Sequence, residues 1–242
     1  MMLALRPKIH PLETMHAYTL RLANANGLNR IPGTLLERRI SSGIAARTDL
    51  PGVSLRRVAE LTGQDGKSLA NQEVRRDAFS WQYQTHRLGQ RHFSLLRRKM
   101  CPTCFDQQGI TPWYWSIRLL TACPDHGLQL IDRCTRCGEP LSWRRDHERC
   151  RCGLEYGRAE APCASSQQVL VSAVILAAVG IAHITTMTPR AAAALQVSDL
   201  ERVALMLNHY RQDLPAGLGR DRSHAHQVGR LLEDWPRGFQ SC

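Results

Sequence analysis

The sequence contains no long apolar run, although it has 242 residues. Its longest apolar stretch extends from Val169 to Ile184 and is interrupted by Ser172, Gly180 and His183. That stretch is shorter than the roughly 20 apolar residues of a membrane-spanning helix, so it predicts a buried helix and no membrane contact. The N-terminus has no charged segment ahead of an apolar one, so no secretory signal peptide is indicated and we expect a soluble, intracellular chain.

Lysine is also scarce, because three of the 32 basic residues are lysines and the others are arginines. The net charge is +11, and it is unevenly distributed: residues 1–100 carry +10, residues 101–163 carry zero and residues 164–242 carry +1. A basic surface confined to one part of the chain indicates a polyanionic partner, most simply nucleic acid. A genome with high GC content also favours arginine codons, and the composition does not separate these two explanations.

Patterns typical of catalytic sites are missing as well. There is no pair of carboxylates in a metal-dependent nuclease pattern and no recognisable Ser/His/Asp order. Gly66-Lys67-Ser68 is similar to the end of a phosphate-binding loop, but the first glycine of that loop would fall on Leu61. We therefore expect a protein that is not an enzyme and has no small-molecule substrate.

Charge and cysteine content divide the chain into three predicted domains. They are a basic helical domain over residues 1–100, a double zinc-binding module over residues 101–163 and a C-terminal helical domain over residues 164–242. The expected fold is mainly α with small zinc-ribbon β elements. Apolar periodicity and capping residues predict helices over residues 13–26, 167–184 and 223–233, and further helix starts at Thr34, Thr188 and Ser198.

Residues 55–74 have the pattern of a helix-turn-helix. Ala59 would lie at the contact between the helices, Gly63 would form the turn, and residues 67–75 would form the second helix. A solvated helical hairpin gives the same pattern, and the basic stretch over residues 83–99 could likewise be a solvated helix face. If the hairpin binds DNA, the expected contact residues are Lys67, Ser68, Asn71, Arg75 and Arg76.

The cysteines give the most specific pattern, because eight of the nine lie between residues 101 and 163. Two ligands separated by two residues can bind one tetrahedral zinc ion, and two such pairs complete its coordination. The spacing therefore predicts two structural Zn²⁺ ions with no open position for a substrate water. The predicted ligand sets are Cys101, Cys104, Cys123 and His126, and Cys134, Cys137, Cys150 and Cys152.

Other pairings also fit the spacing. Cys134 and Cys137 could complete the first set, and His147 could replace Cys150 or Cys152 because a C-x-C pair is less usual. Two further cysteines, Cys163 and Cys242, have no partner motif and are predicted to be free thiols.

Three stretches resemble the TniQ family of transposition target-selection proteins. Two are short: Pro11-Leu12-Glu13 before a helix that ends at Gly27, and Leu61-Thr-Gly63. The third is the cysteine block, which contains Cys101-Pro-x-Cys104, Trp113-Tyr-Trp115, Cys123-Pro-x-His126-Gly127, Cys134-x-x-Cys137-Gly138 and Pro140-Leu141. Residues 232–239, with Trp235-Pro-Arg-Gly, resemble a motif beyond which longer members continue.

The resemblance implies a non-enzymatic adaptor in a heteromeric transposon. Such an adaptor links a target-recognition component, either a DNA site or an RNA-guided CRISPR effector, to an AAA+ transposition regulator. It also implies a homodimer in the bacterial cytoplasm, associated with the nucleoid. The alternative from the residues alone is a stand-alone, sequence-specific, zinc-containing DNA-binding protein that uses the helix-turn-helix. We expect Trp113, Tyr114 and Trp115 to pack the zinc modules together.

Overall fold

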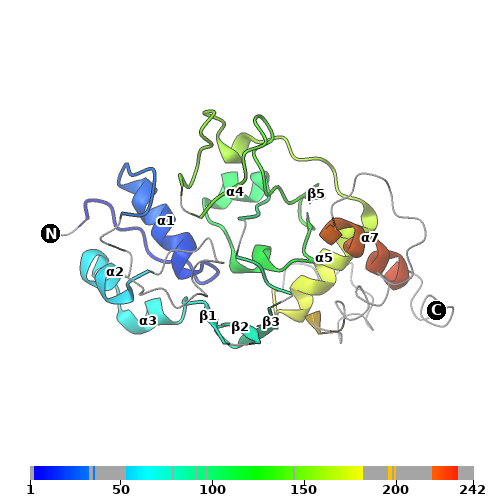
Figure 1. Cartoon of the computed structure of the whole chain (residues 1–242), viewed down its shortest axis with the longest axis horizontal. Helices are drawn as coiled ribbons and strands as arrows, with labels where there is room; N and C mark the ends of the chain where they lie inside the picture. Colours follow the sequence, from blue (N-terminus) through cyan, green and yellow to red (C-terminus); the bar gives the residue numbers. More distant parts are fainter. Residues whose placement is uncertain are drawn as a thin grey trace. The chain divides into compact units, whose positions relative to one another are not determined.

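The structure of the whole chain is a computed structural model (Figure 1). The chain forms two compact units: the first consists of residues 1–87, 94–116 and 131–160, and the second of residues 88–93, 117–130 and 161–242. The division into three consecutive domains stays a prediction. The helix starts predicted at Thr34, Thr188 and Ser198, the motif at Trp235 and the thiol of Cys242 lie outside the described residues. The described residues are 3–32, 35, 53–77, 79–90, 92–95, 98–143, 145–181, 196, 197, 199 and 220–233.

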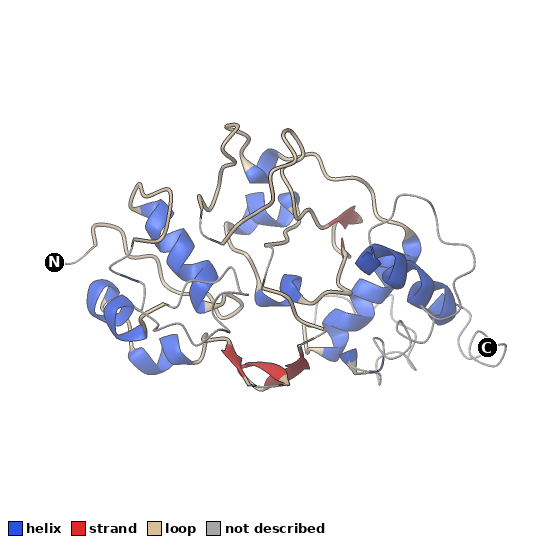
Figure 2. Ribbon diagram, in the orientation of Figure 1, coloured by secondary structure: helices blue, strands red, loops and turns tan. Residues whose placement is uncertain are grey.

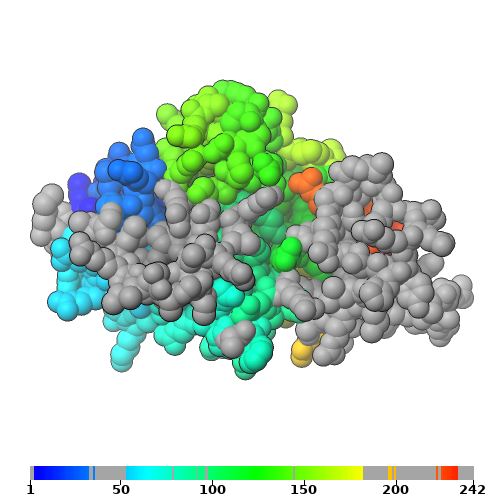
Figure 3. Space-filling model, in the orientation of Figure 1, coloured from blue at the N-terminus to red at the C-terminus, as the bar shows by residue number. Residues whose placement is uncertain are grey.

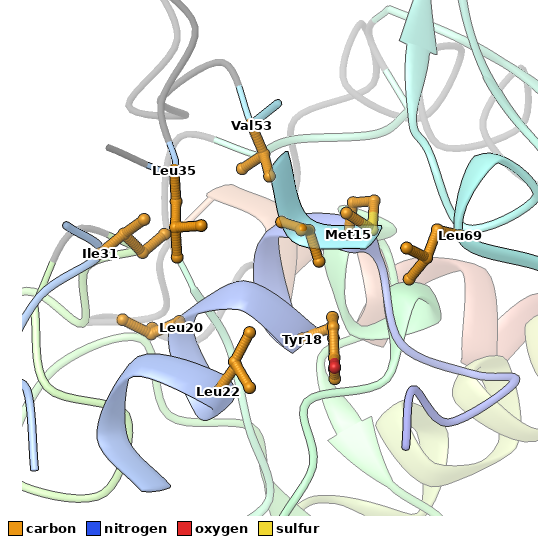
Figure 4. Packing of buried hydrophobic residues seen from close by; sticks show 9 residues of the cluster. Met15, Tyr18, Leu20, Leu22, Ile31, Leu35, Val53 and Leu69 are labelled. Atoms are coloured by element: carbon orange, nitrogen blue, oxygen red, sulfur yellow. The ribbon is translucent and has the colours of Figure 1, made fainter. Parts of the chain in front are cut away.

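Helix α1 (Met15–Ala25) confirms the helix predicted over residues 13–26. It begins at Thr14, whose side chain accepts a hydrogen bond from the Ala17 N–H, and it ends before Gly27. The buried face of α1 belongs to the main apolar cluster of the first unit (Figure 4). That cluster consists of Met15, Tyr18, Leu20, Leu22, Ile31, Leu35, Val53, Val58 and Leu69.

A helical hairpin follows, with α2 (Leu55–Thr62) and α3 (Gly66–Ala70) on either side of the turn at Gly63. Val58 of α2 and Leu69 of α3 are completely buried in the apolar cluster, so the hairpin packs on α1. The two helices and the turn at Gly63 agree with the predicted pattern, while DNA contact stays a prediction.

The predicted extent of the second helix was wrong, because α3 ends at Ala70 instead of Arg75. The chain turns at Asn71, and the carbonyl oxygen of Gln72 accepts a hydrogen bond from the Met15 N–H at 2.7 Å. That contact with the start of α1 diverts the backbone from a helical path. Arg75 and Arg76 consequently lie in a β-strand.

The strand after α3 begins a three-stranded sheet of order β1-β2-β3 (Figure 2). Strands β1 and β2 are antiparallel, and Arg76 is paired with Trp81. The basic stretch over residues 83–99 was predicted as a possible helix face, but its first residues belong to β-strands. The three strands are β1 (Arg75–Arg76), β2 (Ser80–Tyr83) and β3 (His86–Gly89).

Buried aromatic residues attach this sheet to the rest of the first unit. The Tyr83 hydroxyl donates to the Glu13 carbonyl at 2.9 Å, and the Trp113 ring lies 5.0 Å from the Tyr83 ring. His86 stacks on Trp113 with centroids 4.8 Å apart. Trp113 and Trp115 are buried, and Trp113 packs on the sheet. That the three aromatic residues pack the zinc modules together stays a prediction.

The middle of the chain contains little regular structure. Its elements are short, and the longest of them is a helix of seven residues. Strands β4 and β5 pair antiparallel, with Cys123 opposite Leu128. The elements are α4 (Pro102–Gln108), η3 (Trp113–Ser116), β4 (Ala122–Cys123), β5 (Leu128–Gln129) and η4 (Tyr156–Arg158).

Arg98 is completely buried in this part of the first unit. Its guanidinium donates to the Thr111 hydroxyl at 2.8 and 3.0 Å and to the His147 carbonyl at 2.8 Å. Burial lowers the pKa of Arg98 to about 10, so the group stays charged at neutral pH. The cation is further surrounded by aromatic rings, which favour a desolvated guanidinium. Those rings belong to Phe105, Trp143 and Tyr156.

The second unit contains two of the predicted helices. The helix predicted over residues 167–184 is α5 (Ser166–Ala178). The helix predicted over residues 223–233 is α7 (Arg220–Glu233). Ser165 and Gln168 form a capping box at the start of α5. Helices α5 and α7 pack against each other (Figure 1). None of the helices within the described part of the chain is long and apolar enough to cross a membrane.

Gly229 allows the close approach of α7 to α5, because a Cβ atom there would lie 2.5 Å from the backbone oxygen of Gln167. We expect Gly229→Ala to lower the free energy of unfolding by about 1–3 kcal/mol, the usual cost of overpacking, and to lower the urea midpoint. Gly66→Ala is the control, since no atom lies within 4 Å of its added Cβ. An unchanged midpoint for Gly229→Ala would contradict the packing.

Candidate metal centres

The eight predicted ligands lie in two separate groups. The first Cys/His group consists of Cys101, Cys104, Cys123 and His126, and the second Cys group consists of Cys134, Cys137, Cys150 and Cys152. Within each group, all four possible ligand atoms lie within 4.8 Å of one another. The structure thus brings together the sets expected from consecutive pairing, and it does not combine Cys134 and Cys137 with the first group. That the groups bind zinc stays a prediction.

The first Cys/His group is built from two short local motifs. Cys101 is the N-cap of α4 and Cys104 lies in its first turn, while Cys123 ends β4 and His126 lies in the turn to β5. The Cys123 Sγ and His126 Nδ1 atoms are 3.4 Å apart. A tetrahedral zinc ion with ordinary Zn–S and Zn–N bonds separates such atoms by about 3.6 Å, so this pair fits one ion.

The second Cys group has similarly short distances. The Sγ atoms of Cys134 and Cys152 are 3.6 Å apart, and those of Cys137 and Cys150 are 3.5 Å apart. Sulfur atoms around tetrahedral zinc lie about 3.8 Å from one another, whereas a disulfide bond is about 2.05 Å long. The four cysteines are free thiols, so the arrangement fits a Cys₄ zinc site and not a pair of disulfides.

The backbone turns around the ligands depend on glycine. Gly127 and Gly138 each follow the second ligand of a C-x-x-H or C-x-x-C pair, with φ of 62° and 73°. Their N–H groups donate at 2.9 Å to the carbonyl oxygens of Cys123 and Cys134, which are the first ligands of the same pairs. A positive φ is unfavourable for other residues, so these glycines allow each pair of ligand side chains to converge.

The thiols of the second Cys group differ in acidity. Burial opposes ionisation of Cys134, but N–H groups of Cys137 and Arg136 directed at its sulfur outweigh this effect and lower its pKa to about 7. Burial and, to a smaller extent, the neighbouring sulfurs together raise the pKa of Cys150 to about 12. Four crowded thiolates therefore need a cation between them, and a divalent ion such as Zn²⁺ would stabilise all four in the ionised form.

His147, the alternative ligand, does not belong to either group. Its Nε2 atom is 2.9 Å from the Gly109 carbonyl oxygen, and its Nδ1 atom is 3.3 Å from the Arg98 guanidinium. Burial and the nearby Arg98 charge lower the pKa of His147 well below its usual value. The neutral ring thus donates from Nε2 and accepts at Nδ1, which leaves no ring nitrogen for a metal.

The predicted nucleic-acid contacts lie on two consecutive elements of the first unit. Lys67 and Ser68 of α3 and the adjacent Asn71 are exposed, and so are Arg75 and Arg76 of β1. The Ser68 hydroxyl donates a hydrogen bond to the Asp65 carboxylate, which caps the start of α3. The hydroxyl hydrogen is therefore already bonded within the chain. The five residues therefore do not share one helix face, and the structure does not test whether they bind DNA.

The structure has a basic groove beside the second Cys group, which the sequence pattern did not predict. It has a volume of about 1170 Å³, and Cys150 contributes to its wall. Two of its arginines form ion pairs with Glu139 and Glu155, but within the described residues the other two, Arg30 and Arg151, form none. Residues 101–163 have no net charge, so their composition does not indicate this local excess of positive charge. The four arginines are Arg30, Arg145, Arg149 and Arg151.

The sequence model of the TniQ family matches residues 4–130, which include the helical hairpin, the sheet and the first Cys/His group. A comparison with curated proteins gives no match.

Substitution of one cysteine tests the second Cys group. We expect Cys134→Ser to reduce the zinc content from two ions to one per chain and to lower the melting temperature, because a structural zinc ion contributes on the order of 10 kcal/mol to folding. Zinc can be measured by elemental mass spectrometry and unfolding by circular dichroism. Cys163→Ser is the matched control, since Cys163 is exposed and outside both groups. Two zinc ions in Cys134→Ser would refute the assignment.

Proposed function

The chain belongs to the TniQ family, whose proteins take part in DNA transposition, and from this premise we propose that it is a target-selection adaptor. In this proposal it links a target-recognition component, either a DNA site or an RNA-guided CRISPR effector, to an AAA+ transposition regulator. It acts without catalysing a reaction, as a bacterial cytoplasmic protein near the nucleoid, and it forms a homodimer.

The observation that carries this proposal is the composition of the two ligand groups. A Cys₃His set and a Cys₄ set each supply four protein ligands, which fills the tetrahedral coordination of zinc. A catalytic zinc ion keeps one position for water or substrate, and neither set leaves one. The role that fits such ions is to hold a segment of little regular structure in a fixed shape, so that its surface can bind partners.

Two surfaces of the first unit support contact with a polyanion. One consists of the exposed residues of α3 and β1, and the other is the groove that contains Arg30 and Arg151. Both present arginine or lysine groups that can pair with phosphates. Contacts of this kind fix a protein on DNA without reading its sequence, which suits an adaptor whose target is chosen by another component.

A second candidate function is that of a stand-alone, sequence-specific DNA-binding protein. The observation in its favour is the hairpin of α2 and α3, which leaves Lys67, Ser68 and Asn71 exposed on or beside the second helix. In helix-turn-helix proteins the second helix enters the major groove, and its polar side chains contact the base edges. Here α3 has only five residues, which gives it a shorter reading surface.

Binding measurements with the zinc-loaded full chain separate the two functions. We expect weak binding to random duplex DNA and to an attachment site alike, with an affinity that falls steeply as salt rises. We also expect the chain to retain the AAA+ regulator of the same transposon in a pull-down, and to lose this ability when a chelator removes zinc. Tight binding to one site, about 10³-fold or more above random DNA, without retention of the regulator would instead favour the stand-alone DNA-binding protein.

Charge removal tests the surface of α3. We expect Lys67→Ala to weaken binding to random duplex DNA and to reduce the slope of log affinity against log salt by about 0.9, the value for one lost phosphate contact. Arg158→Ala is the control, because it removes an exposed positive charge from η4, outside the predicted surface. Equal salt slopes for Lys67→Ala and the unmodified chain would remove α3 from the DNA-binding surface.

A further inference from the structure

Phe79 is the most exposed of the large hydrophobic residues in the described part of the chain, with 83% of its surface accessible. It lies in the turn between β1 and β2, which is part of the surface of the first unit (Figure 3). The two other exposed large hydrophobic residues, Leu5 and Leu28, lie outside the sheet. The Phe79 ring is therefore accessible to another molecule.

The Asp77 carboxylate is a hydrogen-bond acceptor for the residues at and after Phe79. The Asp77 carboxylate accepts hydrogen bonds from the Phe79 N–H at 2.8 Å, the Ser80 N–H at 2.6 Å and the Ser80 hydroxyl at 2.7 Å. The Arg87 guanidinium also donates to this carboxylate at 2.9 Å. The backbone N–H groups of Phe79 and Ser80 are therefore held in place before any partner arrives, which lowers the entropy cost of binding through the ring.

The surroundings of Phe79 are polar and contain charges of both signs. Arg75 forms an ion pair with Glu73 at 3.2 Å, and Arg87 forms one with Asp77 at 2.9 Å. Arg75 and Arg76 are exposed on β1, and Arg87 is exposed on β3. The Arg76 guanidinium lies 5.2 Å from the centre of the Trp81 ring, which orients it at the surface of the sheet. A single aromatic ring among guanidinium groups differs from a protein-binding hot spot, where other apolar contacts surround the anchor and exclude water.

We infer that the β1–β2 turn is a nucleic-acid contact in which the Phe79 ring stacks on a nucleobase while the arginines of β1 pair with the adjacent phosphates. The chemistry follows from the parts, because every base has a face on which an aromatic ring can stack and every nucleotide brings an anionic phosphate. Apolar side chains also enter duplexes by partly unstacking a base step. This inference rests on the proposed function and extends it, since it adds a base-stacking element beside the phosphate-binding surface.

The source of the base is either an unpaired strand or a distorted duplex, and the two are distinguished by the probe. Three fluorescent DNAs of equal length serve this purpose: a perfect duplex, the same duplex with one mismatched pair, and a single strand. Unstacking costs least where pairing is already weak, so we expect the unmodified chain to prefer the mismatched duplex over the perfect one. Stronger binding to the single strand than to either duplex would identify unpaired DNA as the source.

The test compares Phe79→Ala, Phe79→Trp and Leu5→Ala in the zinc-loaded full chain by fluorescence anisotropy. We expect Phe79→Ala to lose about tenfold in affinity for the preferred probe, a loss typical of one stacked base, with an unchanged salt slope because no phosphate contact is removed. Phe79→Trp should retain the affinity, since indole stacks as well. Leu5→Ala, which removes another exposed apolar side chain, should bind all probes as the unmodified chain does.

Two results would overturn the inference. The first is equal affinity of Phe79→Ala and the unmodified chain for all three probes. The second is a loss in Phe79→Ala of AAA+ regulator retention with unchanged DNA binding, which would assign the ring to a protein partner. Failure of the adaptor proposal looks different, because the regulator would then not be retained even by the unmodified chain, while dependence of DNA binding on Phe79 would stand.

Discussion

The middle of this protein depends on two groups of side chains, in each of which four possible metal ligands converge. Between residues 101 and 160 the chain has one helix of seven residues, two short 3₁₀ turns and two strands of two residues among its described residues. The segment buries large apolar side chains such as Trp113, Ile117 and Trp143, but elements this short are not stable by themselves. Cys/His groups that bind zinc would supply the missing free energy, and the left-handed backbone at Gly127 and Gly138 allows the ligands to converge.

Arginine has two different roles in the first unit. Arg98 is buried among aromatic rings and donates to Thr111 and to the His147 carbonyl, so it joins the start of α4 to the segment before Cys150. Arg30 and Arg151, in contrast, are exposed and available to phosphates. Arg98 thus stabilises the interior, whereas Arg30 and Arg151 belong to a surface that we propose contacts a polyanion.

Local signals made much of this structure predictable. The ligand sets followed from spacing, α1 from its apolar periodicity and the glycine after it, and α5 from its apolar stretch. The sheet was not predictable, because its strands have two to four residues and are stabilised by distant contacts such as the hydrogen bond from Tyr83 to Glu13. The burial of Arg98 and the exclusion of His147 from the ligands depend on partners far away in the sequence, and no local pattern indicates them.

The most direct test of the central claim is the zinc X-ray absorption spectrum of the purified full chain. Two closed sites formed by the two groups contain seven sulfur ligands and one imidazole nitrogen. The spectrum should therefore show four-coordinate zinc. Each zinc ion should have on average about 3.5 sulfur atoms and about 0.5 nitrogen atoms, with Zn–S distances of about 2.3 Å. A shell with fewer sulfur atoms and an additional oxygen would reveal an open coordination position. That result would contradict a purely structural role and require a catalytic function to be considered.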